Sequence, residues 1–76
     1  MSEEEQRRKL EFAVFCIENV ADRLKIDARK VYLALTEQTN ILNEYILPEY
    51  EILHTQSKDY IVDDILEVMK ENEVEL

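Results

Sequence analysis

The hydrophobic residues of the first third of the chain recur with the spacing of one long helix. At about 100° per residue, a single stripe of that helix contains Leu10, Ala13, Val14, Ile17, Val20, Ala21 and Leu24. Ser2 precedes Glu3, Glu4 and Glu5, which together form a capping box with carboxylates at the positive end of the helix dipole. We therefore predict a helix over about residues 3–25 at the centre of the fold.

Between residues 12 and 17 this helix is apolar on nearly every side, because Phe12, Phe15 and Cys16 fall outside the stripe. Two interpretations are open. In the first, the other helices wrap around a central helix. In the second, these three residues form a candidate interaction surface, since exposed apolar patches usually mark contact sites. A second copy of the chain would cover such a surface, so a homodimer through the first helix is also expected.

Shorter helices are predicted after the first one. They cover about residues 28–38, 41–46, 48–54 and 58–72. Asp27 is the expected N-cap of the second helix, and the Thr39–Asn40 pair breaks the pattern and offers another cap. Pro48 suits the first turn of a new helix, where its missing N–H costs nothing.

Composition agrees with an all-α protein. The chain has 76 residues and no Gly, although average usage would give roughly five. Glycine-rich phosphate-binding loops are thereby excluded, and tight hairpin turns are improbable. We predict a single domain over residues 1–76, a small bundle of four or five helices around the long N-terminal helix. Residues 70–76 should fray, because their carboxylates stand at the negative end of a helix.

A single Cys excludes an internal disulfide and fits a reducing compartment. The first ten residues are charged and lack the apolar core of a secretory signal. The longest apolar run, residues 12–17, has six residues, whereas a bilayer span needs roughly 20. A cytoplasmic protein that does not contact the membrane is therefore expected.

The stretch LHTQSKDYIVDDI, residues 53–65, holds the only His and several polar side chains. We interpret His54 as a helix C-terminus, Thr55 and Gln56 as a connector, and Ser57 as the N-cap of the last helix, with Asp59 in its first turn. These five residues form a candidate structural polar cluster.

Two chemical alternatives use His54. A catalytic site would pair it with Ser57, Cys16 or an aspartate, and a metal site would add Asp59 and Asp63 at i, i+4. Helix ends explain the same residues without either, so we expect no enzyme activity, no cofactor, no metal and no small-molecule substrate.

The negative charge is concentrated in the second half. Residues 1–38 carry seven Lys or Arg and eight Asp or Glu, a net charge of −1, whereas residues 39–76 carry two against ten, a net charge of −8. This acidity serves solubility, or it forms a surface matched to a basic partner. Residues 27–47 have the outline of a helix-turn-helix. However, no Lys or Arg occurs between Val31 and Thr55, so nucleic acid is an improbable partner.

The segments CIENVADRL, VYLAL, YILPEY, LHTQS and YIVDDI, in this order and spacing, resemble a family of short bacterial proteins of unknown function. The resemblance covers about residues 9–66, and LHTQS followed by YIVDDI is its most specific part. It implies no functional residue. Genes of this type tend to lie beside others of unknown function, some resembling ADP-ribosyltransferase-like proteins, and this implies a protein partner.

We therefore expect a small acidic helical interaction or adaptor protein. One version of this hypothesis is that it neutralises the product of a neighbouring gene. A small transcriptional regulator using residues 27–47 is the first alternative. A metal-binding or catalytic protein using His54 is the second.

Overall fold

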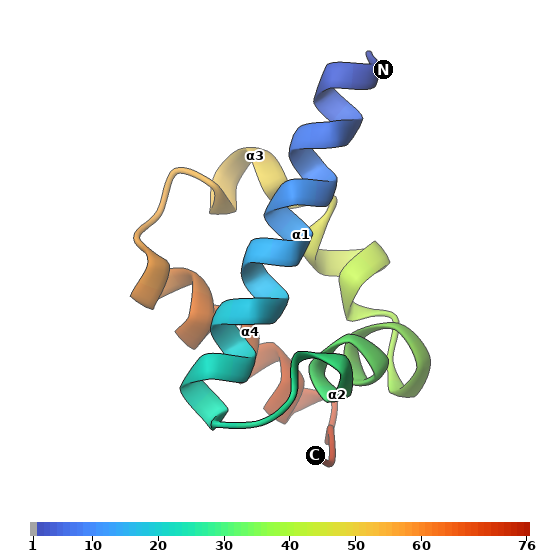
Figure 1. Ribbon diagram of the computed structural model, residues 1–76, viewed down its shortest axis with the longest axis vertical. Coiled ribbons are helices and arrows are strands. Elements are labelled where there is room, and N and C mark those ends of the chain that lie inside the picture. The colour runs from blue at the N-terminus through green and yellow to red at the C-terminus, as the bar shows by residue number, and fades with distance from the viewer. Residues whose placement is uncertain (1) are drawn as a thin grey trace.

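Helices make up all the regular structure of residues 2–76, the part of the chain that this computed structural model describes. In chain order the elements are α1 (Glu3–Leu24), α2 (Ala28–Leu33), η1 (Ala34–Gln38), η2 (Leu42–Ile46), α3 (Tyr50–Leu53) and α4 (Lys58–Glu71). The elements η1 and η2 are short π-helices. The predicted all-α class is confirmed, and α1 is the long N-terminal helix around which the others gather (Figure 1). None of the described helices has the length and apolar content of a membrane span.

The two ends of α1 follow from local hydrogen bonding. Ser2 Oγ accepts a hydrogen bond of 3.1 Å from the Glu5 amide, as the capping box predicts. Lys25 adopts the left-handed conformation, with φ 60°, and its amide donates to the carbonyls of Ala21 and Asp22. A left-handed residue commonly ends a helix, and in a chain without Gly a lysine takes that role here.

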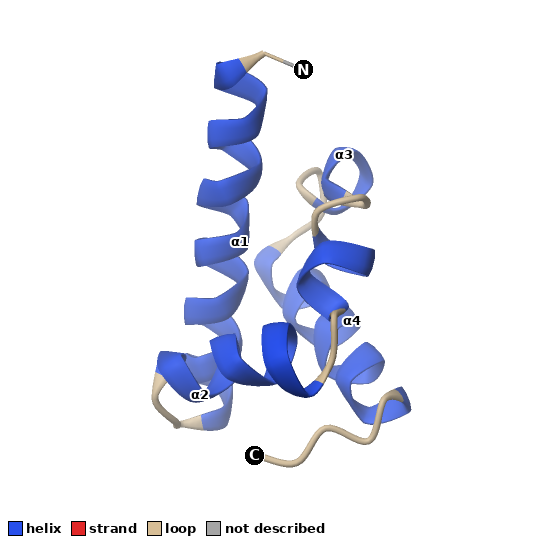
Figure 2. Ribbon diagram, turned by 90° about the vertical axis from the view of Figure 1, so that its right-hand side faces the viewer, coloured by secondary structure: helices blue, strands red, loops and turns tan. Residues whose placement is uncertain are grey.

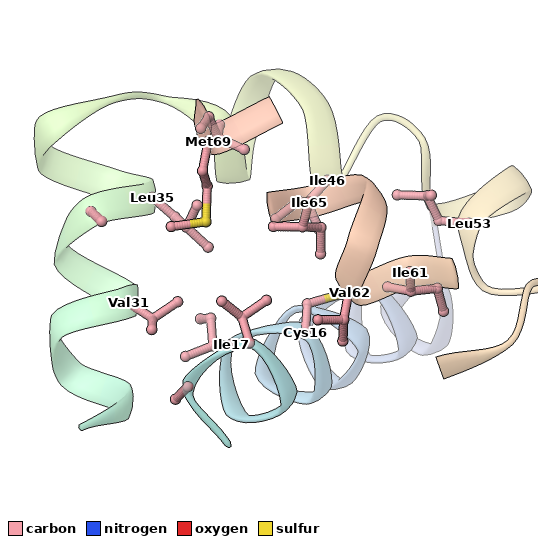
Figure 3. Packing of buried hydrophobic residues seen from close by; sticks show 14 of the residues in the cluster. Cys16, Ile17, Val31, Leu35, Ile46, Leu53, Ile61, Val62, Ile65 and Met69 are labelled. Atoms are coloured by element: carbon pink, nitrogen blue, oxygen red, sulfur yellow. The ribbon is translucent and has the colours of Figure 1, made fainter. Parts of the chain in front are cut away.

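The buried face of α1 differs from the predicted stripe. Its buried residues are Phe12, Ala13, Cys16, Ile17, Val20 and Ala21. Leu10 and Val14, which were predicted to face inward, are 61% and 53% exposed. Phe12 and Cys16, which belong to the candidate interaction surface, are core residues at 8% and 0% exposure, so Cys16 lies beneath any such surface. The reason is tertiary: Phe12 packs on Tyr50 of α3, and Cys16 belongs to the buried cluster that also contains Val62 of α4 (Figure 3).

The second predicted helix has the expected bounds but changes its hydrogen-bond pattern. Asp27 caps α2 by accepting a hydrogen bond of 2.8 Å from the Arg29 amide. From Ala34 onward the chain is π-helical, and the Thr39 amide donates to the Ala34 carbonyl at 3.2 Å. Thr39 Oγ1 then accepts from the Ile41 amide at 3.2 Å, so the predicted break at this position is also a cap.

The remaining helices close over α1. Helix α3 is shorter than predicted, because Pro48 precedes it rather than forming its first turn. Helix α4 begins with Ser57 Oγ accepting from the Tyr60 amide at 3.1 Å, as predicted. The core joins all the elements and includes the fully buried side chains Leu35, Ile46, Ile65, Val20, Val31, Val62 and Cys16 (Figure 3).

The C-terminal tail returns beneath α2, as Figure 2 shows. Gln38 exchanges two hydrogen bonds with the Glu75 backbone: its side-chain amide donates to the carbonyl at 3.0 Å and accepts from the N–H at 3.3 Å. The predicted fraying of residues 70–76 concerns motion and stays a prediction.

Candidate functional site

An open groove of about 360 Å³ lies between α1, α3 and the start of α4. Its lining residues are Arg8, Glu11, Phe12, Phe15, Tyr50, His54, Gln56 and Ile61. We call it the aromatic groove. It brings together two groups that the sequence placed far apart, namely Phe12 and Phe15 from the predicted interaction surface and His54 and Gln56 from the predicted polar cluster.

Four rings, each in contact with the next, form a row along this groove, which we call the stack. The ring centroid of Phe12 lies 6.2 Å from that of Phe15 and 5.4 Å from that of Tyr50, which it meets edge to face. Tyr50 then stacks on His54 with ring centroids 4.5 Å apart and an angle of 11° between the planes. Such ring pairs contribute about 0.5–1.5 kcal/mol each beyond their buried area. The stack therefore holds its walls in place, while Phe15, at 38% exposure, remains open to the outside.

The hydrogen bond of the His54 ring defines which of its two nitrogens carries the proton. Nδ1 lies 2.7 Å from the Tyr50 carbonyl oxygen, which can only accept, so Nδ1 carries the proton. The Tyr50 carbonyl also accepts from the His54 amide at 2.9 Å, which ends α3. In the neutral ring Nε2 is then the acceptor, and His54 is one of the residues that line the aromatic groove.

The rest of the predicted polar cluster makes contacts that end one helix and begin the next. Thr55 Oγ1 donates to the Ile52 carbonyl at 2.8 Å, and Ser57 caps α4. Asp59 lies 3.4 Å from Arg23, whose guanidinium also donates to Asp63 at 2.7 Å. These residues join α3, α4 and α1, whereas His54 and Gln56 line the aromatic groove.

The geometry gives no support to a catalytic or metal site at His54. Ser57 Oγ is occupied as a helix cap, and burial raises the pKa of the Cys16 thiol to about 12, which disfavours the reactive thiolate. Within residues 2–76 no three His, Cys, Asp or Glu side chains gather as metal ligands would. That the chain is not an enzyme stays a prediction.

A second feature, which the sequence did not indicate, lies on the acidic half. Tyr45 of η2 donates a hydrogen bond to Asp64 of α4. Its pKa is raised, first by burial, then by the hydrogen bond to Asp64, and then by the charges of Asp64 and Glu49. Tyr60, also among the groups that act on Tyr45, is 52% exposed. We call Tyr45, Glu49, Tyr60 and Asp64 the acidic patch.

Spacing alone could not have found either surface. Tyr50 and Tyr45 looked like helix residues of a short amphipathic segment, and their partners Phe12 and Asp64 lie on other helices. Composition offered no signal either, because the four Tyr and two Phe make up only 8% of the chain.

Searches of curated proteins and of solved structures returned no match. A family model does match, over residues 11–72, which is most of the chain and includes both α3 and the LHTQS and YIVDDI segments. The chain therefore belongs to a family described as proteins of unknown function, DUF3791.

Proposed function

We propose that this chain is a protein-interaction module that binds a basic protein partner through the aromatic groove and the neighbouring acidic half. The observation that carries the proposal is the row of rings from Phe15 through Phe12 and Tyr50 to His54, which lines an open groove at the edge of the core. Aromatic residues in such preformed positions are typical of the anchors of protein interfaces.

A preformed groove lowers the cost of binding. Side chains that become ordered only in a complex cost about 0.5–1.5 kcal/mol each. Here Tyr50 and His54 are already held by stacking and by the bond from Nδ1 to the Tyr50 carbonyl. The groove can therefore accept an apolar or aromatic side chain of a partner without first ordering its own walls.

The charge distribution supports a basic partner. Residues 39–76 have a net charge of −8, and this acidic half includes Glu49 and Asp64 of the acidic patch. Such a field accelerates the approach of a positively charged protein and falls with ionic strength. The aromatic groove itself contains both Glu11 and Arg8, so the attraction to a basic partner comes from the neighbouring acidic half.

The product of a neighbouring gene, implied by the resemblance given above, is the first partner to try, with this chain as its neutralising or adaptor subunit. The regulator alternative has less support. Residues 34–46, where a recognition helix would lie, form η1 and η2 and carry Glu37 and Glu44 without any Lys or Arg. Carboxylates there would repel DNA phosphates.

Affinity capture with matched variants tests the proposal. Phe15→Asp places a charge in the aromatic groove, and Tyr32→Asp places one on α2, where the side chain is 49% exposed. A protein captured by the wild type is identified and purified, and its binding is measured by calorimetry at low and at physiological salt. We expect Phe15→Asp alone to abolish binding, and wild-type affinity to fall as salt rises. Equal binding by both variants, or stronger binding at higher salt, would contradict the proposal.

A further inference from the structure

The α1 wall of the aromatic groove has a carboxylate next to an exposed ring. Glu11 and Phe15 both line the groove. They stand at i and i+4 of the helix, so their side chains are neighbours on one face of α1. Phe15 is 38% exposed and ends the row of rings on this side. A ligand in the groove can therefore contact a ring and a carboxylate together.

The Glu11 carboxylate has no partner within the chain. Among residues 2–76 it takes part in no ion pair or side-chain hydrogen bond. Arg8, the cation in the same lining, is bound instead by Glu4, whose Oε1 lies 2.7 Å from Arg8 Nη2. The remaining lining residues that face α1 bring neither a carboxylate nor a Lys or Arg to the groove; they are Tyr50, His54, Gln56 and Ile61.

A second hydrogen-bond acceptor comes from the connector between α3 and α4. The Gln56 side chain lines the groove, and its amide group makes no hydrogen bond within the described part of the chain. Its oxygen can accept hydrogen bonds. The groove thus combines aromatic rings with two acceptors, one of them charged.

An arginine side chain matches this combination better than other side chains do. Its guanidinium group is planar and always charged, stacks on aromatic rings and donates up to five hydrogen bonds. A lysine ammonium is compact and strongly hydrated, and it has no flat face. An apolar side chain would cover Glu11 and remove water from its carboxylate without replacing the lost hydrogen bonds. An anion would approach a chain of net charge −9.

We propose that the aromatic groove binds an arginine side chain of the partner, with the guanidinium against Phe15 and its N–H groups donated to Glu11. This inference rests on the proposed function and names the anchor that the basic partner inserts. The acidic half attracts the partner from a distance. The Glu11 carboxylate and the Phe15 ring then select arginine on contact.

The test is a titration of the isotopically labelled full chain at low salt, followed by the amide signals in nuclear magnetic resonance. The probes are N-acetylarginine methylamide and its lysine and leucine counterparts, each taken into the millimolar range. We expect the arginine probe to shift the amide signals of Glu11, Phe15 and Gln56. It should bind about threefold more tightly than the lysine probe, because only the guanidinium stacks and donates in one plane.

Two variants with the same change in charge separate contact from general acidity. Glu11→Gln and Glu37→Gln each remove one negative charge, but Glu37 is exposed on η1 and outside the groove lining. Glu11→Gln should weaken binding of the arginine probe about threefold, as loss of an exposed ion pair does. Glu37→Gln should leave it unchanged. Both side chains are exposed, so the circular dichroism of both variants should match that of the wild type.

Equal affinities for the arginine and lysine probes would overturn the proposal, as would an equal loss in the two variants or the absence of any shift with the arginine probe. Tighter binding of the leucine probe would also overturn it while leaving the proposed function intact, because an apolar anchor would then fill the groove. The probes require no partner protein. The proposed function fails separately, when a captured protein binds Phe15→Asp and Tyr32→Asp equally.

Discussion

Alkaline pH should destabilise this protein partly through the buried thiol of Cys16. Replacing Cys16 should show how much of the loss in unfolding free energy is due to that thiol. Cys16 has no exposed surface, and burial raises its pKa from 9.0 to about 12. The folded state therefore favours the protonated thiol. Its contribution to stability is fully present below pH 9.0 and is lost progressively as pH rises from 9.0 toward about 12.

The magnitude follows from the size of this shift. Each pH unit between the unfolded and folded pKa values costs about 1.4 kcal/mol, so the wild type should lose roughly 2–3 kcal/mol of stability through Cys16 by about pH 11. At neutral pH Cys16→Ala should itself cost about 1 kcal/mol, because a small buried group is lost. The variant begins less stable and should become the more stable protein above about pH 10.

Urea unfolding followed by circular dichroism at a series of pH values between 7 and 11 measures both proteins. Every other titratable group is common to both proteins, so its contribution cancels in the difference. If the stability difference between Cys16→Ala and the wild type stays constant across this range, the raised pKa is refuted. A crossing near neutral pH would refute the stated magnitude.

Four further outcomes are expected. Leu35→Ala should cost about 2–5 kcal/mol in urea unfolding, because Leu35 is fully buried. Ser57→Ala should lower the free energy of unfolding by about 1 kcal/mol. Ser2→Ala should lower it much less, because the first turns of α1 contain no buried residue, and equal losses for the two variants would contradict this. His54→Gln should cost about 0.5–1 kcal/mol by denaturation, and a divalent ion lost with the imidazole in calorimetry would contradict the structural role. Gln38→Ala should speed amide hydrogen exchange in the C-terminal tail, and unchanged exchange would show that the tail frays regardless.

Local chemistry made the helix ends predictable. Ser2, Asp27 and Ser57 were each assigned as caps from the sequence, and each side chain accepts the expected backbone hydrogen bond. A cap depends on residues within one helical turn, so four or five consecutive residues are enough to predict it. The bounds of α1 and α4 were therefore predicted to within about one residue.

The buried face of α1 could not be predicted in the same way. Around residues 12–17 the helix is apolar on nearly all sides, and periodicity cannot then decide which side packs. The decision belongs to α3 and α4, which cover Phe12 and Cys16 and leave Val14 outside. The sequence also did not indicate the change from α- to π-helix at Ala34, where Ala34 and Leu35 are fully buried.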